Sequence, residues 1–265
     1  MKKVFAVFLS LCLLLGAAFT AAADSPEAIL ARCADAMRQL NSFAVKGTLT
    51  TGVQGLISPI TVDALSAQVF AEPFKAHVLA NVMGYILGAY AEEQGGKLYL
   101  YTTRNLDYWV AHTVDWALSD VPEPEPAMLA EWLAKAGDVR VEGTETIGGR
   151  EAWRLGADIN LRELMEHDTI EEGIGVALGV QAKDLLPLYE PLPLRIDVFV
   201  DVQTNVLLRV GIDASEFFSS MLTLLTPSQP GMQSEPMAAQ TTLTIDFMDF
   251  DAVPDFEVPA EAKAR

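Results

Sequence analysis

The most constraining feature of this chain is a regular alternation of apolar and polar residues between Arg195 and Asp213. Apolar side chains recur at every second position on both sides of the short turn Gln203-Thr204-Asn205. Period two is typical of a strand with one buried face, so this segment predicts an antiparallel hairpin. Asp197 and Asp201 fall on its polar side, and we expect both to face water.

Strand patterns recur along the rest of the chain. The glycine pairs Gly95-Gly96 and Gly148-Gly149 each separate two strand-like runs and predict two more hairpins. Other strand-like runs lie at residues 43–49, 61–70, 74–82 and 241–250. Residues 52–59 predict a turn-rich connection, and residues 249–265 predict a tail that ends in polar residues.

One clear helix precedes these strands. Ser25 is a capping hydroxyl, Pro26 suits the first helical position, and the apolar spacing through Leu40 is helical. No strand–helix–strand repeat follows. The predicted fold class is therefore α+β, with a single long curved antiparallel sheet.

The N-terminus predicts export. Lys2 and Lys3 precede an uncharged apolar run and the small residues 20–23, which is the pattern of a signal peptide (residues 1–23) cleaved after Ala23. The alternative is an uncleaved anchor, although the run is short for a membrane span. We therefore expect the protein to be extracytoplasmic, that is, secreted, on the cell surface or in the periplasm. Cys33 is then the one cysteine of the mature chain, and its place on an apolar stripe predicts burial.

Composition excludes some functions. The chain has 18 Lys and Arg against 36 Asp and Glu, a net charge of −18, and no cluster of cations. Nucleic acids and anionic membranes would repel such a protein. The hydrophobic fraction of 51% is sufficient for a substantial core.

Catalytic motifs are missing from the sequence. His77, His112 and His167 do not have the spacing of a zinc site, and there is no nucleophile elbow or glycine-rich phosphate loop. The aspartates at 246, 249 and 251 lack the calcium-loop spacing and its glycine. We therefore expect a protein that is not an enzyme and has no cofactor or metal.

Several motifs resemble those of one known family. They are Asn-Ser-Phe-Ala-Val-Lys-Gly at 41–47, Glu-Glu-Gln-Gly-Gly-Lys-Leu-Tyr at 92–99 with Trp109, the hairpin at 141–155, and the ending at 245–250 with 256–259. In order and spacing they resemble the LolA-like superfamily of lipoprotein and lipid carriers, which includes LppX-type lipoproteins. The resemblance covers residues 24–265 and implies an open half-barrel around helices, with an apolar cavity. Long insertions near 164–193 and 217–237 depart from the family. They could bind a protein partner, and their stretches 170–180 and 217–225 could act as lids.

The apolar strand positions allow two interpretations. They either line a cavity on the concave face or form a core beneath the helices, and the resemblance favours the cavity. The candidate ligand-binding residues are Val45, Val78, Ala80, Val82, Ile196, Val198, Val200, Leu208, Val210 and Ile245. The expected function is non-enzymatic binding of a lipid or acyl chain by an exported monomer, with lipid or lipoprotein transport implied. The alternative is an extracytoplasmic protein-interaction or sensory module with a filled core.

Overall fold

The computed structural model describes residues 25–82, 84–114, 139–160, 193–225 and 238–263. These residues form three helices, α2 (Pro26–Arg38), α7 (Ser215–Leu225) and α8 (Ala260–Lys263). They also form 11 strands: β1 (Ser42–Val53), β2 (Ile57–Phe70), β3 (Lys75–Val82), β4 (Tyr85–Gln94), β5 (Lys97–Arg104), β6 (Tyr108–Val114), β7 (Arg140–Ile147), β8 (Arg150–Asn160), β9 (Pro193–Asp201), β10 (Leu207–Asp213) and β11 (Ala239–Met248).

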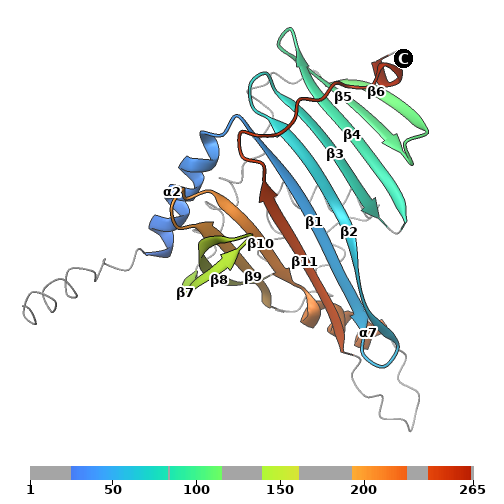
Figure 1. The fold of residues 1–265 in the computed structure, drawn as a ribbon. Helices are drawn as coiled ribbons and strands as arrows, with labels where there is room; N and C mark the ends of the chain where they lie inside the picture. The colour runs from blue at the N-terminus through green and yellow to red at the C-terminus, as the bar shows by residue number, and fades with distance from the viewer. Residues whose placement is uncertain (1–24, 83, 115–138, 161–192, 226–237, 264–265) are drawn as a thin grey trace, which may run out of the picture.

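All the strands belong to one antiparallel sheet. Their order is β6-β5-β4-β3-β2-β1-β11-β10-β9-β8-β7, and β6 and β7 are its unpaired edges (Figure 1). The sheet is therefore open and does not close into a barrel. This confirms the predicted fold class, including the hairpins at Gly95-Gly96, Gly148-Gly149 and Gln203-Thr204-Asn205.

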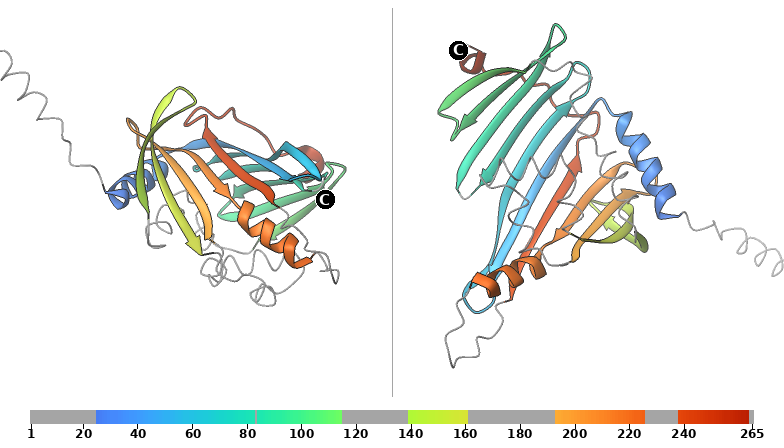
Figure 2. Two further views of the ribbon diagram at one scale, coloured as in Figure 1. Left: turned by 90° about the horizontal axis from the view of Figure 1, so that it is seen from below. Right: turned by 180° about the vertical axis from the view of Figure 1, so that it is seen from behind.

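The sheet is bent, and its two faces carry different elements. Helices α2 and α7 lie on the concave side, as the views from below and from behind show (Figure 2). The segment after β11 crosses the outer side instead (Figure 1). No helix among the described residues is both long and apolar enough to pass through a bilayer.

Helix α2 fills the concave side of β8, β9 and β10. The Ser25 hydroxyl accepts a hydrogen bond from Ala28 N at 3.3 Å and caps the helix, as the sequence predicts. Its buried face packs against these strands, and Leu207 N donates to Met37 Sδ at 3.3 Å. Cys33 is buried as predicted, which raises the pKa of its thiol to about 12.

The residues after β11, which the sequence predicts to be a tail ending in polar residues, pack against the sheet. Residues 249–263 run over the outer face of β1 to β6, where the ring of Phe256 lies 5.9 Å from that of Tyr90. Lys263 Nζ lies 2.9 Å from a carboxylate oxygen of Glu92 in β4. This C-terminal strap (residues 249–263) provides part of the outer face with the cover that helices give the other side.

Residues 52–59 are also more regular than predicted. Strands β1 and β2 continue to Val53 and Ile57, which are paired, so they form one long hairpin. A Cβ on Gly52 would lie 2.8 Å from the Cα of Pro59, so glycine permits this close approach. The turn residues of the sequence thus mark the end of a long two-stranded projection.

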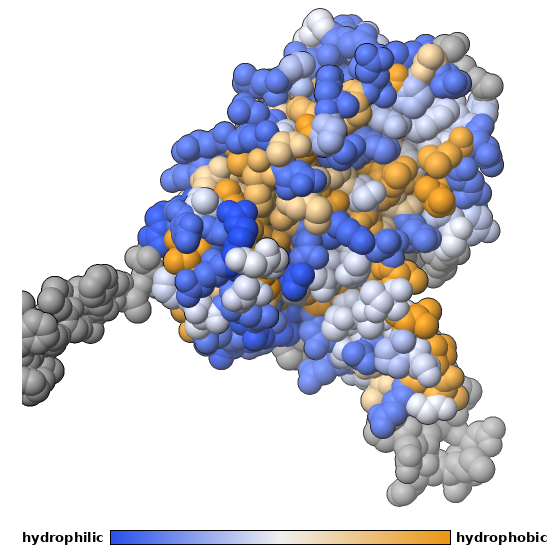
Figure 3. All heavy atoms as spheres, in the orientation of Figure 1, coloured by the Kyte–Doolittle hydropathy of each residue, from blue (hydrophilic) through white to orange (hydrophobic). Residues whose placement is uncertain are grey.

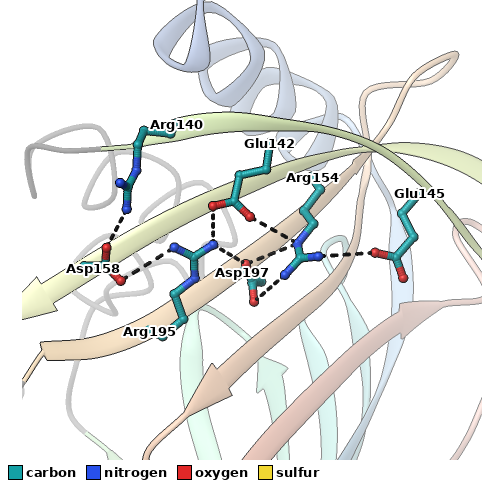
Figure 4. Close-up of polar contacts among 7 residues, drawn as sticks. All are labelled: Arg140, Glu142, Glu145, Arg154, Asp158, Arg195 and Asp197. Carbon is teal, nitrogen blue, oxygen red and sulfur yellow. Dashed lines mark hydrogen bonds and ion pairs between the residues drawn. The ribbon is translucent and has the colours of Figure 1, made fainter.

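The outer face of β7 to β9 carries a network of ion pairs instead of apolar cover (Figure 4). Asp197 is half-buried between two guanidinium groups, at 3.3 Å from Arg154 and 3.0 Å from Arg195. The hydrogen bond from Arg195 to Glu142 raises the pKa of the Arg195 guanidinium, which therefore stays charged. The sequence predicts that Asp197 faces water, whereas its carboxylate is in fact paired with two guanidinium groups.

Asp201 is the clearer correction, because its side chain is buried at the end of β9. One carboxylate oxygen accepts hydrogen bonds from Gln203 N at 2.9 Å and Thr204 N at 2.6 Å, and the other accepts from Arg150 Nε at 2.7 Å. Burial alone would raise the pKa of Asp201, but these donors keep it below the ordinary 3.8. The carboxylate therefore fixes the β9–β10 turn.

We predict that Asp201→Asn lowers the free energy of unfolding by about 2 kcal/mol at pH 7, because it leaves buried donors poorly paired. The lowered pKa means that the stabilisation is complete above the unfolded-state pKa and is lost as the pH falls through the folded-state pKa. The difference between wild type and variant should therefore shrink at acid pH. Denaturant titrations at pH 7 and at pH values below 3.8 measure this. A constant difference would contradict the role given to the carboxylate.

Candidate functional site

The strand register places most of the predicted ligand-binding residues on the concave face. Val198 pairs with Val210, Val210 with Ile245, and the remaining members follow along the same ladders. The residues placed there are Val45, Val78, Ala80, Ile196, Val198, Val200, Val210 and Ile245. Leu208 is buried at a bulge between β9 and β10. Val82 belongs to β3, but its side chain lies outside the described residues.

These residues divide into two environments. Those on β9 and β10 are at most 4% exposed and belong to the core beneath α2. Those on β1 and β3 are only half-buried, and so is Ile245 on β11, although Ile245 packs against the core beneath α2. The two interpretations of the sequence thus apply to different halves of one sheet: the β8–β10 half is a filled core, and the other half is the candidate site. That the ten predicted ligand-binding residues contact a ligand stays a prediction.

The candidate site is floored by small and apolar side chains. One row of paired residues crosses β1 to β6 through Val45, Ala67, Val78, Ala89, Thr102 and Val110. A neighbouring row crosses from β11 to β6 through Ile245, Gly47, Leu65, Ala80, Leu87, Arg104 and Tyr108. At about 4.8 Å between strands, the first row is roughly 24 Å long.

A hollow lies over part of this floor. Its volume is about 490 Å³, and its lining includes Val78, Ala80, Leu87, Ala89 and Val110. Arg104 also lines the hollow, with its guanidinium carbon 4.2 Å from the centre of the Tyr85 ring. The arrangement can hold an apolar body along the floor and a negative group at Arg104.

A second hollow of about 510 Å³ lies on the outer face, where apolar atoms form a band among polar ones (Figure 3). Its lining mixes Leu79, Ile86 and Met248 with Gln68, Asn81 and the Lys46–Asp63 ion pair of 3.0 Å. A buried acyl chain would leave those polar groups without water, which is costly. The concave hollow is therefore the better site for an apolar ligand.

The residues considered for metal or acid–base chemistry have structural roles. Asp246 pairs with Arg209 at 2.6 Å, and Asp251 accepts Asn41 N at 2.6 Å. His77 stacks on Tyr90 with ring centres 4.2 Å apart, and burial lowers its pKa. Within the described residues, no three His, Cys, Asp or Glu side chains lie close enough together to hold a metal ion. His167 and the proposed lid at 170–180 lie outside those residues.

Several residues of the site were not predicted from the sequence. Arg104, Leu87, Ala89 and Val110 line the hollow. The sequence indicated β4 and β5 only as the two runs beside Gly95-Gly96, and it did not indicate β6. Period two within β4 places Leu87 and Ala89 on one face, but only the pairing of Ala80 with Leu87 across the β3–β4 turn shows that this is the face of Val78 and Ala80. Nothing in the sequence marks Arg104.

Comparison with known proteins gives structural resemblance only. No family model matches the chain, and no curated protein matches it significantly. Among solved structures it is similar to the Mycobacterium tuberculosis lipoprotein LppX, at 13% identity over 88% of this chain and 98% of that chain, with a TM-score of 0.45. LprF from Mycobacterium bovis is 14% identical over 89% of this chain and 97% of that chain, with a TM-score of 0.46.

A further match is MucB in complex with MucA(peri), at 13% identity over 88% of this chain and 59% of that chain, with a TM-score of 0.28. The LppX-type resemblance noted in the sequence thus recurs among solved structures. Similarity at these levels says nothing about the ligands of this chain, so its function has to be inferred from its own sheet.

The difference between the two halves of the concave face is testable with matched substitutions. Ala89 lines the hollow, whereas Ala157 is 3% exposed in the core beneath α2. We predict that Ala89→Phe changes the free energy of unfolding by less than about 1 kcal/mol, whereas Ala157→Phe costs about 3 kcal/mol through overpacking. Urea unfolding measures both. Equal losses would show that the two halves are equally filled.

Proposed function

We propose that this protein is an exported, non-enzymatic binder of a lipid or acyl chain, which it holds on the concave face of β1 to β6. Lipid or lipoprotein transport is the corresponding biological role. The signal peptide ending at Ala23 supports export, although it lies outside the described residues. Binding by shape and dispersion needs no catalytic group.

The observation that supports this proposal best is the apolar floor and its hollow of about 490 Å³. The floor is roughly 24 Å long, whereas one leaflet of acyl chains spans roughly 15 Å. A single acyl chain therefore fits across the strands. Its burial is favourable by about 0.8 kcal/mol per methylene without any charged anchor.

Affinity should accordingly depend on chain length. We predict that the Kd of saturated fatty acids falls roughly fourfold for each added methylene from 10 to about 14 carbons. Displacement of a fluorescent fatty acid from the purified protein measures the series, and Ala89→Phe should weaken every member. Affinities that are absent, or independent of chain length, would refute the proposal.

Arg104 should select ligands with a negative head. We predict that Arg104→Gln weakens dodecanoate binding roughly tenfold by removing a charge-assisted hydrogen bond, and leaves dodecanol binding unchanged. Arg104→Lys is the control, because it keeps the charge and should retain most of the affinity. Equal losses for the acid and the alcohol would mean that Arg104 acts by packing alone.

A second candidate function is the docking of a protein partner, and the hollow on the outer face favours it. That hollow combines apolar residues with hydrogen-bonding groups such as Gln68 and Asn81, a mixture typical of protein interfaces. Crosslinking in the exporting cell tests it. Recovery of one stoichiometric protein partner, from a preparation that contains no lipid, would favour this function over the first.

A further inference from the structure

The exposed apolar side chains of the described residues are concentrated in one part of the molecule. They all lie at or near the ends of three hairpins, β1–β2, β3–β4 and β5–β6. We call this set the apolar rim: Leu56, Ile57, Ile60, Val62, Tyr85, Ile86, Leu87, Leu106, Tyr108 and Val110. Leu56, at the tip of the longest hairpin, is 72% exposed.

The three hairpin turns lie on the same side of the sheet, at one end of its strands. Successive antiparallel strands reverse direction. The turns after β1, β3 and β5 therefore lie at one end of the strands, and those after β2 and β4 lie at the other end (Figure 1). At the opposite end of the strands, the turns contain or adjoin Glu72, Glu93 and Lys97. Of the turns at the two ends of the strands, only those of the rim are apolar.

Charge is distributed in the same way. Residues 47–62, which form most of the β1–β2 hairpin, contain no Asp, Glu, Lys or Arg, although the whole chain has a net charge of −18. Leaving aliphatic side chains exposed on such a projection is unfavourable unless something covers them. Tyr85 and Tyr108, each with an apolar ring and a polar hydroxyl, suit the boundary between lipid and water.

We propose that the apolar rim docks on the surface of a lipid bilayer with zwitterionic headgroups. An anionic bilayer would repel this acidic chain, and so would a second copy of it. The rim has no cluster of cations with which to overcome that repulsion, because these three turns hold no Lys or Arg: Arg104 ends β5 beside the third turn, and that turn holds Asp107. A neutral surface into which aliphatic side chains insert is the complementary partner.

Docking at the rim would also align the bilayer with the concave hollow. Leu87, Tyr108 and Val110 belong to the rim and line the hollow as well. An acyl chain could then move between bilayer and hollow without crossing water. This role in transfer rests on the proposed function, whereas docking itself requires no ligand site.

The test is co-flotation with phosphatidylcholine vesicles. The protein should begin at Asp24, because the apolar run before it would itself bind lipid and every residue of the described fold follows it. We expect wild type to float, and the triple variant Leu56→Ser, Ile57→Ser, Ile60→Ser to lose at least fivefold of the bound fraction. The control Gln54→Ser, Ser58→Thr changes the same turn without removing aliphatic groups, and should float like wild type.

The lipid composition provides a second comparison. Adding phosphatidylglycerol should reduce binding, and salt should restore it. Wild type that fails to float on any vesicle, or a triple variant that floats equally well, would overturn the proposal. A wild type that is dimeric by light scattering, and a triple variant that is monomeric, would instead make the rim an interface between copies and would also overturn it.

A fluorescent label gives a reading specific to the rim. Cys33 is buried with a pKa of about 12, so a thiol introduced by Leu56→Cys can be labelled selectively. The label should become brighter on phosphatidylcholine vesicles, whereas a label at Lys97→Cys at the opposite end of the strands should not. Fatty-acid displacement from the triple variant separates the two proposals: retained displacement with lost flotation shows that the fold and the ligand site are intact.

Discussion

The structure depends on how the two apolar faces of one large sheet are kept from water. An antiparallel sheet can leave one face solvated, but every apolar face needs a cover. Here α2 covers the concave side of β8 to β10, and the C-terminal strap covers part of the outer side of β1 to β6 and leaves the outer hollow beside it. On the outer side of β7 to β9, the ion pairs around Arg154 and Arg195 replace an apolar cover (Figure 4).

This arrangement leaves the concave side of β1 to β6 with an unusual floor. Its positions carry alanine and valine more than leucine or phenylalanine, as in the row through Ala67, Val78 and Ala89. Small side chains fill little space above a sheet, so a hollow remains where a close-packed core would otherwise form. The strap packs on the outside of these strands, through Phe256 against Tyr90 and Lys263 against Glu92.

Local sequence patterns predicted the fold better than they predicted its long-range features. The alternation from Ile196 to Ile212 and the two glycine pairs identified hairpins whose partners are close in sequence. The insertion of β11 between β1 and β10 was beyond such patterns, because β11 pairs with β1, which lies near the other end of the chain. Asp201 was misplaced because period two carries no information on hydrogen bonds: its carboxylate accepts from the backbone of its own turn and from Arg150 of β8.

The site was predictable only in part, for a physical reason. Period-two spacing indicates which residues of a strand share a face, and Val45, Val78, Ala80 and Ile245 do share one. It cannot tell whether that face is filled. Ile196 and Val198 have the same spacing, yet they are core residues because α2 happens to lie over them. The position of a helix in space decides between core and cavity.

The distribution of charge connects the two proposals. Acidic groups keep most of the surface hydrated. Hydration of these groups is favourable in water, but the same groups would oppose the insertion of that surface into lipid. A lipid-handling protein of this charge therefore needs a neutral region next to its site, and the apolar rim lies beside the hollow. Arg104 is at that boundary, over the ring of Tyr85. A negative headgroup held there would remain near water while its acyl chain lies along the floor, so a bound lipid would be oriented with its head toward the rim.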